Sequence, residues 1–166
     1  MILTGQEIIN SINSGDITIS NFDCSRINPN SYNYLLGNEI KVFSEKDTDG
    51  SPKFDTIILN EEGYVLRPGS MYLGVTDEII GSSLYAMSLI GRSSMGRLGL
   101  FLQISANLGH TTSSHQWTLE LHAARSIRIY PKMPIGQVSF WKNDGDVQCL
   151  GKTYALYNRP TERLPT

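Results

Sequence analysis

Short stretches in which apolar and polar residues alternate run through most of this chain of 166 residues. Alternation with a period of two is typical of β-strands that bury one face. Turn-forming residues separate the stretches, as in Arg67-Pro68-Gly69-Ser70 and Asn143-Asp144-Gly145-Asp146. Short strands joined in this way predict an all-β sandwich or distorted jelly roll. The strands that we expect cover residues 16–20, 31–43 with a turn at 36–38, 56–59, 64–66, 72–75, 84–90, 100–106, 117–121, 126–130 and 135–141.

One helix is expected near the N-terminus. Thr4-Gly5-Gln6-Glu7 has the capping-box pattern, in which side chains satisfy backbone N–H groups at a helix start. Ile8 and Ile12 recur at helical spacing, and Gly15 is suited to end the helix. The apolar stripe predicts a structural helix that packs on the β-rich body.

Length and charge limit the class of protein. A chain of 166 residues suits one domain, which we place at 1–166, and a formal net charge of -2 argues against a dedicated nucleic-acid binder. No apolar run has the length needed to span a bilayer and no signal peptide precedes the helix, so we expect a cytoplasmic protein without a membrane partner. Cys24 and Cys149 are expected to be reduced core thiols, with a disulfide left open. The polar residues 45–54 predict an exposed loop.

Two arginines, two serines and three glycines lie close together in Gly91-Arg92-Ser93-Ser94-Met95-Gly96-Arg97-Leu98-Gly99-Leu100. Ser93 and Ser94 are good N-caps for a short helix, whose free N–H groups favour anions. Arg92 and Arg97 add positive charge and planar donors, so the stretch predicts a phosphate site. A surface turn with solvated arginines is the alternative. The spacing of a P-loop is absent.

A single carboxylate stands inside an otherwise apolar strand further along the chain. Trp117, Leu119 and Leu121 alternate with Thr118, Glu120 and His122, which places Glu120 away from the main apolar stripe. A solvent-facing carboxylate on a sheet is the alternative interpretation.

Together these stretches resemble the dCTP deaminase branch of the trimeric dUTPase-like superfamily. The segment from Gly91 to Leu100 is similar to the family signature G-R-S-S-[LV]-[AG]-R-L-G-L. Ser105-Ala106 stands where the family has Thr-Ala or Ser-Ala, and Trp117-Thr118-Leu119-Glu120 resembles the family's T-L-E strand at unchanged spacing. The resemblance implies the β-clip variety of jelly roll, with an N-terminal helix. Further matches are Asn28-Pro29-Asn30-Ser31-Tyr32, Leu66-Arg67-Pro68-Gly69, Ile129-Tyr130-Pro131 and Ile135-Gly136-Gln137.

The activity that this resemblance implies is zinc-independent hydrolytic deamination of dCTP to dUTP and ammonia. Glu120 would take a proton from water and return it to the pyrimidine ring, and Arg97 would hold Glu120 in place. The Ser93 hydroxyl and the Ala106 carbonyl would orient the water. The expected substrate contacts are Arg92 and Ser94 at the phosphates, together with Ser105, His110, Thr118, Gln137, Lys152 and Tyr154.

The family also implies an assembly and a metal ion. Its sites lie between the subunits of a homotrimer, and Mg²⁺ would bind through the substrate triphosphate. Residues 151–166 resemble a tail that folds over the nucleotide, with a frayed terminus as the alternative. Bound zinc is not expected, because no cysteine belongs to the H-x-E and P-C-x-x-C pattern of zinc deaminases. We expect His110, His115 and His122 to be solvent-facing or hydrogen-bonded.

Two departures from the family pattern bear on the activity. By an ungapped count, His110 replaces an aspartate that contacts the sugar and, in dUTP-hydrolysing relatives, directs a water at the phosphates. Asn33 replaces a second aspartate, and we assign it a structural role. A dUTP diphosphatase, or a bifunctional deaminase and diphosphatase, stays open as an alternative, although this chain lacks the aspartate that such an enzyme uses as its base. A catalytically silent nucleotide-binding homologue with a regulatory role and a purely structural β-sandwich protein also stay open.

Overall fold

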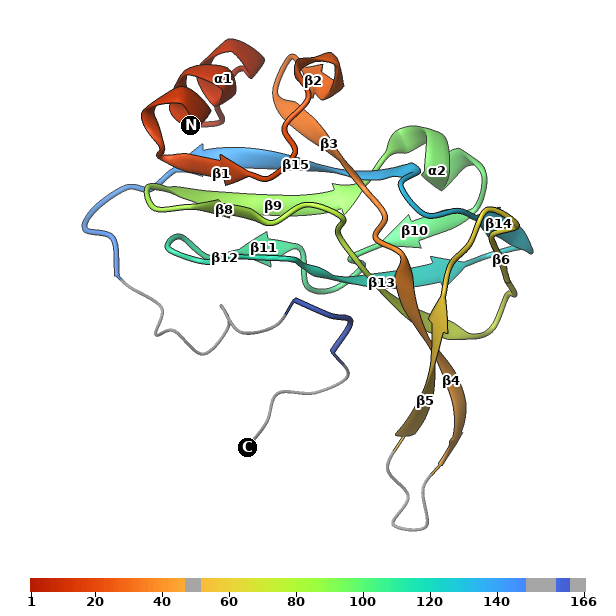
Figure 1. Cartoon of the computed structure of the whole chain (residues 1–166). Helices are drawn as coiled ribbons and strands as arrows, with labels where there is room; N and C mark the ends of the chain where they lie inside the picture. Colours follow the sequence, from red (N-terminus) through yellow and green to blue (C-terminus); the bar gives the residue numbers. More distant parts are fainter. Residues whose placement is uncertain (47–51, 149–157, 162–166) are drawn as a thin grey trace.

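The computed structural model describes residues 1–46, 52–148 and 158–161. β-Strands dominate these ranges, and α1 (Gly5–Ser14) lies near the N-terminus (Figure 1). The expected β-rich class with one N-terminal helix is therefore confirmed. None of the helices in these ranges has both the length and the apolarity that crossing a bilayer requires.

Two five-stranded antiparallel sheets form the body of the molecule. The first has the order β11 (Leu108–Gly109), β9 (Tyr85–Gly91), β15 (Pro134–Lys142), β3 (Ser31–Leu35) and β2 (Ile27–Asn28). The second has the order β10 (Leu100–Leu102), β13 (Thr118–Ala123), β7 (Met71–Val75), β4 (Glu39–Lys46) and β5 (Pro52–Ile58). Smaller sheets join β1 (Ile17–Ile19) to β8 (Ile80–Ser82) and β12 (Ser114–His115), and β14 (Ile127–Ile129) to β6 (Tyr64–Leu66).

The helix α1 follows the sequence pattern closely. Its first turn is capped by Thr4, whose hydroxyl accepts a hydrogen bond from the N–H of Glu7 at 3.3 Å. Its end is set by Gly15, which has a left-handed φ of 85°. Ile8 is fully buried, so the apolar stripe docks the helix on the body as expected.

Side chains from both large sheets meet in one buried apolar cluster. Tyr32, Tyr34 and Phe140 are its largest fully buried members. The Tyr34 hydroxyl donates to the carbonyl of Ile90 at 3.1 Å, which satisfies its polar end inside the core. The core therefore depends on β3 and β15 lying side by side, as their register shows.

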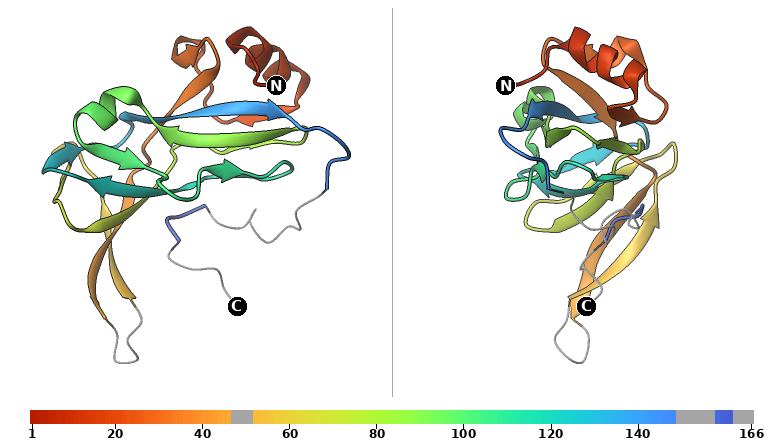
Figure 2. Two further views of the ribbon diagram at one scale, coloured as in Figure 1. Left: turned by 180° about the vertical axis from the view of Figure 1, so that it is seen from behind. Right: turned by 90° about the vertical axis from the view of Figure 1, so that its left-hand side faces the viewer.

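Two paired strands occupy both ends of the loop that we expected at residues 45–54 and form a long hairpin. β4 runs to Lys46 and β5 begins at Pro52, and residues 47–51 lie outside the described ranges. Phe43 and Phe54 face each other across the hairpin with an edge-to-face ring contact at 5.9 Å. Cross-strand pairing therefore stabilises strands that polar composition argued against. Figure 2 shows from two further sides that this hairpin projects from the body.

A buried ion pair fastens the segment before β2 to the turn before β8. Glu78 is fully buried, pairs with Arg26 and accepts the N–H of Leu35 at 3.0 Å. Burial raises the pKa of Glu78, while the Leu35 N–H and Arg26 favour its charged form. Arg26 belongs to the short 3-10 helix η1 (Cys24–Arg26), which directly precedes β2. Cys24 is a free, exposed thiol rather than the expected core thiol, and Cys149 lies outside the described ranges.

Replacement of Gly136 by alanine should destabilise the fold. A Cβ atom at this position of β15 would overlap the ring and hydroxyl of Tyr34, which is fully buried and hydrogen-bonded. We expect Gly136→Ala to lower the free energy of unfolding by about 1–3 kcal/mol, measured by chemical denaturation. In the control Gly96→Ala the Cβ meets open space, so stability should stay within about 1 kcal/mol of the parent or rise. Equal denaturation midpoints for the two variants would contradict the argument.

Candidate active site

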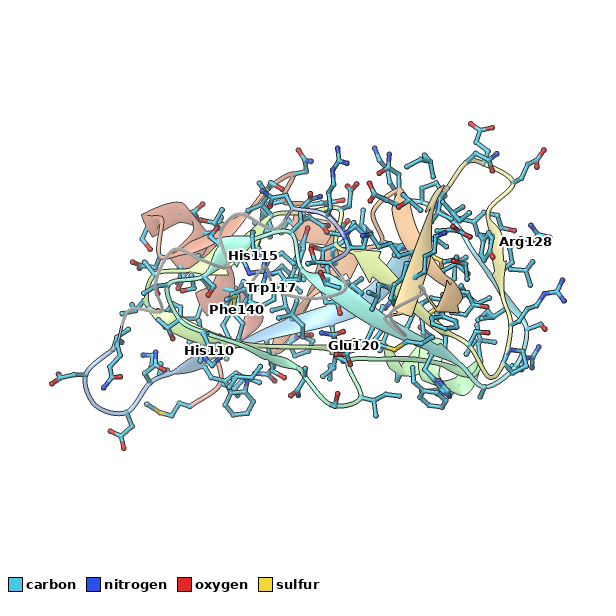
Figure 3. The ribbon with its side chains drawn as sticks, turned by 90° about the horizontal axis from the view of Figure 1, so that it is seen from below. His110, His115, Trp117, Glu120, Arg128 and Phe140 are labelled. Atoms are coloured by element: carbon cyan, nitrogen blue, oxygen red, sulfur yellow. The ribbon has the colours of Figure 1, made fainter. Side chains whose placement is uncertain are left out.

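Glu120 lies on β13, whose two neighbours in the sheet are β10 and β7. Leu119, Leu121 and Ala123 on the same strand are each 0% exposed. Since successive side chains of a strand point to opposite faces, the half-buried Glu120 faces away from this core. Figure 3 shows Glu120 on this strand, seen from below. The expected orientation of the carboxylate is therefore observed.

The loop after β10 reaches Glu120. The Ser105 hydroxyl donates to Oε2 of Glu120 at 3.4 Å, a long hydrogen bond. The carbonyl of Ala106 accepts a hydrogen bond from the side-chain amide of Gln103 at 3.0 Å. The structure thus brings Glu120, Ser105 and Ala106 into one neighbourhood within a single chain.

Gln103 is a member of this neighbourhood that the sequence patterns did not predict. The strand expected at 100–106 ends at Leu102, because Gln103 has a left-handed φ of 51°. Its side-chain oxygen accepts the backbone N–H of Glu120 at 2.6 Å. In the sequence Gln103 is an ordinary polar residue of an alternating stretch, which carries no signal of this contact.

The signature forms the short helix α2 (Ser93–Arg97), between β9 and β10. Its N-cap is Arg92, and no side chain caps the helix, so the expectation that Ser93 and Ser94 act as N-caps is wrong. Both serines instead occupy the first helical positions with exposed side chains. The chain already enters the helix at Arg92 because the backbone N–H of Arg92 bonds to the carbonyl of Ile135 at 3.3 Å.

The arginines of the signature differ in their surroundings. Arg92 is half-buried, and its guanidinium donates to the carbonyl of Pro134 at 3.3 Å. Arg97 is exposed. Within the described part of the chain, no ion pair joins Arg97 or Arg92 to Glu120. A single chain therefore presents the carboxylate and the cationic helix without pairing them.

Two further expected substrate contacts, Thr118 and Gln137, lie in different places. Thr118 accepts the N–H of Thr161 at 3.2 Å, so a short piece of the tail lies beside the start of β13. Gln137 lies on β15, pairs with Asn33 on β3 and accepts the hydroxyl of Ser31 at 3.0 Å. Lys152 and Tyr154, with most of the expected lid at 151–166, lie outside the described residues.

The histidines do not gather at one point. His110 follows β11 and is exposed, and His122 is exposed on β13. His115 is buried against Trp117, with ring centroids 4.1 Å apart, and its Nδ1 lies 2.8 Å from the carbonyl of Gln116. A carbonyl only accepts, so Nδ1 carries the proton, and burial lowers the pKa of His115. Among the described residues no cluster of His, Cys, Asp or Glu could hold a metal ion. Figure 3 labels His110, His115 and Trp117.

The turn that carries His110 contains a strained residue. Thr112 has a φ of 71°, which is rare for a β-branched residue, and its buried hydroxyl has no hydrogen-bond partner. The turn is held by the N–H of Thr112, which donates to the carbonyl of Ser82 at 2.8 Å. The side-chain amide of Asn143 also donates to the Thr111 hydroxyl at 2.9 Å.

Comparison with known proteins shows the family to which this chain belongs. Residues 2–143 match the family model described as dCTP deaminase-like. The chain belongs to the dCTP deaminase-like family. A protein of Rhodopirellula baltica named dCTP deaminase is 44% identical over 88% of this chain and 74% of its own length. A protein of Clostridium botulinum named "dCTP deaminase, dUMP-forming" is 42% identical over 95% of this chain and 88% of its own length.

A solved structure shares the fold of this dCTP deaminase-like chain. It is the crystal structure of 2'-deoxycytidine 5'-triphosphate deaminase from Agrobacterium tumefaciens, with a TM-score of 0.68 and 19% sequence identity. The alignment covers 86% of this chain and 48% of that one, so this chain spans about half of the solved protein. At this identity the likeness concerns the fold, which confirms the expected dUTPase-like architecture.

Replacement of Thr112 by glycine should stabilise the protein. Glycine adopts the left-handed conformation without strain and removes the unpartnered hydroxyl, which outweighs its larger entropy in the unfolded chain. We expect the free energy of unfolding to rise by about 1 kcal/mol, with a higher melting temperature in calorimetry. The matched control Thr111→Gly removes the acceptor for Asn143 and should lower stability. A lower melting temperature for Thr112→Gly would show that Thr112 is not strained.

Proposed function

We propose that this protein hydrolyses dCTP at C4 of the cytosine ring, giving dUTP and ammonia. The relative named dCTP deaminase, at 44% identity, supports this activity, and the relative at 42% identity named "dCTP deaminase, dUMP-forming" supports deamination of dCTP. The observation that carries the proposal is the Glu120 carboxylate, which faces away from the core on a well-anchored strand and accepts a hydrogen bond from Ser105. A carboxylate held in this way can move protons between a water molecule and a ring.

Glu120 acts as general base and then as general acid in this proposal. It removes a proton from the attacking water as the oxygen bonds to C4, and it delivers that proton to N3. The amino group then takes the second proton of the added water, the C4–N bond breaks, and ammonia leaves. One carboxylate is sufficient because it regains its starting charge in each cycle.

The water needs fixed hydrogen bonds to aim it at the ring. The carbonyl of Ala106 lies in the loop beside Glu120 and uses one lone pair to accept from Gln103, which leaves the other for water. We assign the second contact to the hydroxyl of Ser93, at the start of α2. A well-placed group of this kind contributes about 3 kcal/mol to stabilising a transition state.

The complete site is built between protomers of a homotrimer in this proposal. Glu120 has no ion-pair partner among the described residues, and Arg97 is exposed, so Arg97 of a neighbouring protomer is free to hold the carboxylate. An apolar surface on the Glu120 face of the sheet also supports an interface there: Phe101 pairs with His122 and His122 with Met71. Phe101 and Met71 are 44% and 49% exposed. Exposed apolar side chains in a row are typical of subunit contacts.

The triphosphate is assigned to the cationic side of the same site. Arg92 has donors left beyond its bond to Pro134, and Ser94 is exposed at the first turn of α2. Mg²⁺ held by the phosphates would neutralise part of their charge in this proposal. Lys152 and Tyr154 complete the phosphate and base contacts in this proposal.

The names of some relatives state a different product, dUMP. The protein of Clostridium botulinum carries the name dUMP-forming, which implies that pyrophosphate is also released by that enzyme. Residues 107–116 of this chain contain no aspartate or glutamate, and His110 stands at the position of the family's aspartate. We therefore propose dUTP as the product and assign the dUMP-forming reaction second place.

The two reactions differ in what they release. Incubation with Mg²⁺ and a panel of deoxycytidine and deoxyuridine nucleotides, with ammonia and pyrophosphate measured separately, distinguishes them. Ammonia from dCTP without pyrophosphate supports the proposed function. Equal amounts of both indicate the dUMP-forming reaction, pyrophosphate from dUTP alone indicates a diphosphatase, and neither product with retained nucleotide binding indicates a catalytically silent homologue.

Substitution of Glu120 by glutamine should abolish deamination while keeping nucleotide binding. The amide preserves the shape and the contact with Ser105 but cannot accept a proton from water. We expect kcat for ammonia release to fall about 1000-fold or more, with Kd for dCTP in calorimetric titration changed less than about threefold. The control Glu62→Gln, at an exposed turn, should leave both values unchanged. Substantial turnover by Glu120→Gln would refute the assigned base.

A further inference from the structure

We infer that Gln103 is a positioning residue for Glu120, an inference that rests on the deamination proposed above. β10 and β13 pair regularly up to Leu102 and Leu121. Gln103 and Glu120 occupy the next position, where the regular strand β10 has ended. The local geometry at Gln103 decides where the carboxylate and the loop that contacts it are held.

The side chain of Gln103 continues the ladder that its backbone leaves. The backbone N–H of Gln103 still donates to the carbonyl of Glu120, at 3.2 Å. In a regular pair the carbonyl of Gln103 would accept the N–H of Glu120 in return. Because φ is 51°, the chain turns away, and the side-chain oxygen accepts that N–H instead, at 2.6 Å. Gln103 therefore holds both backbone groups of Glu120, its N–H and its carbonyl, by hydrogen bonds.

The other end of the same amide fixes the loop. Its nitrogen donates to the carbonyl of Ala106 at 3.0 Å, which closes a tight turn from 103 to 106. Ser105 lies inside this turn and donates to the Glu120 carboxylate. Gln103 thus sets the position of the two groups that surround the carboxylate, the Ser105 hydroxyl and the Ala106 carbonyl.

A glutamine is well suited to this position. It is half-buried, and only a side chain with both a donor and an acceptor can bond to an N–H and a carbonyl together. A left-handed φ is unfavourable for a residue with a Cβ, and three hydrogen bonds keep Gln103 in this conformation. Strain that neighbouring groups maintain in this way is common at functional sites.

A double-mutant cycle on ammonia release from dCTP tests the inference. Gln103→Ala should lower kcat about 10- to 100-fold with KM changed less than about threefold, since misplacement of reacting groups acts mainly on the chemical step. Ser105→Ala should lower kcat by a smaller factor. The double variant should be no slower than Gln103→Ala by more than about twofold, because Ser105 acts only when Gln103 places it. Multiplied effects, or a Gln103→Ala enzyme as fast as the parent, would overturn the inference.

Hydrogen exchange of the free protein supplies a measurement that does not depend on activity. Gln103→Ala should speed exchange of the Glu120 amide about tenfold or more. Gln103→Glu keeps an acceptor for that amide, so it should retain the protection of Glu120 and lose only the bond to Ala106, with a lowered kcat. This second variant keeps the inference testable if Gln103→Ala does not fold. An unchanged exchange rate at Glu120 in Gln103→Ala, or an unchanged kcat in Gln103→Glu, contradicts it.

A matched control is available between β12 and β13. The side-chain amide of Gln116 also bonds to backbone carbonyls, those of Thr76 and Asp77 at 2.9 and 3.2 Å. Gln116→Ala should therefore lower the melting temperature without lowering kcat, and a kcat loss equal to that of Gln103→Ala would reduce the role of Gln103 to general stability. If the parent protein releases no ammonia from dCTP, the proposed function fails, while the exchange data still report whether Gln103 holds Glu120.

Discussion

The register of β13 is the constraint on which the site depends. Five residue pairs join this strand to β7 and three join it to β10, so it cannot slide without breaking two ladders. Three of its side chains, Leu119, Leu121 and Ala123, are 0% exposed. A slip by one residue would carry Glu120 into the core, where an unpaired carboxylate costs many kcal/mol. The register that buries these apolar residues therefore also places the Glu120 carboxylate on the opposite face of the sheet.

The loop at 103–106 shows how precise placement is added to this frame. A sheet fixes which face a carboxylate occupies, but it does not orient its oxygen atoms. The Ser105 hydroxyl does so, and it is carried by a turn whose two ends are joined by the amide of Gln103. Glu78 differs in this respect, since that carboxylate is fully buried and paired with Arg26. A carboxylate enclosed in this way cannot exchange protons with a substrate, whereas the half-buried Glu120 retains access to one.

Sequence patterns predicted the features that depend on periodicity and on local capping. Alternation located most long strands and the face of Glu120, and the caps at Thr4 and Gly15 bound α1 as expected. The patterns failed where a contact between distant segments decides the backbone. Polar residues of β4 and β5 form strands because they pair with each other, and β10 ends early because Gln103 has a left-handed φ, with its side chain bonded to Glu120. Strands of two residues, such as β11 and β12, are too short for alternation to identify.

The positions of His110 and Glu120 indicate how deamination and phosphate hydrolysis can be separated in the proposed function. His110 lies in a turn that is tied to β8 through Ser82 and to Asn143 after β15. Glu120 and its loop are tied instead to β10 and β7 through a different set of hydrogen bonds. In the proposed function, the change from the family's aspartate to His110 removes a negative charge and a water-directing group from the first set without altering a bond that holds the second. A chain with this arrangement can give up a reaction at the phosphates and keep one at the base, provided that the sugar is held by groups other than the missing carboxylate.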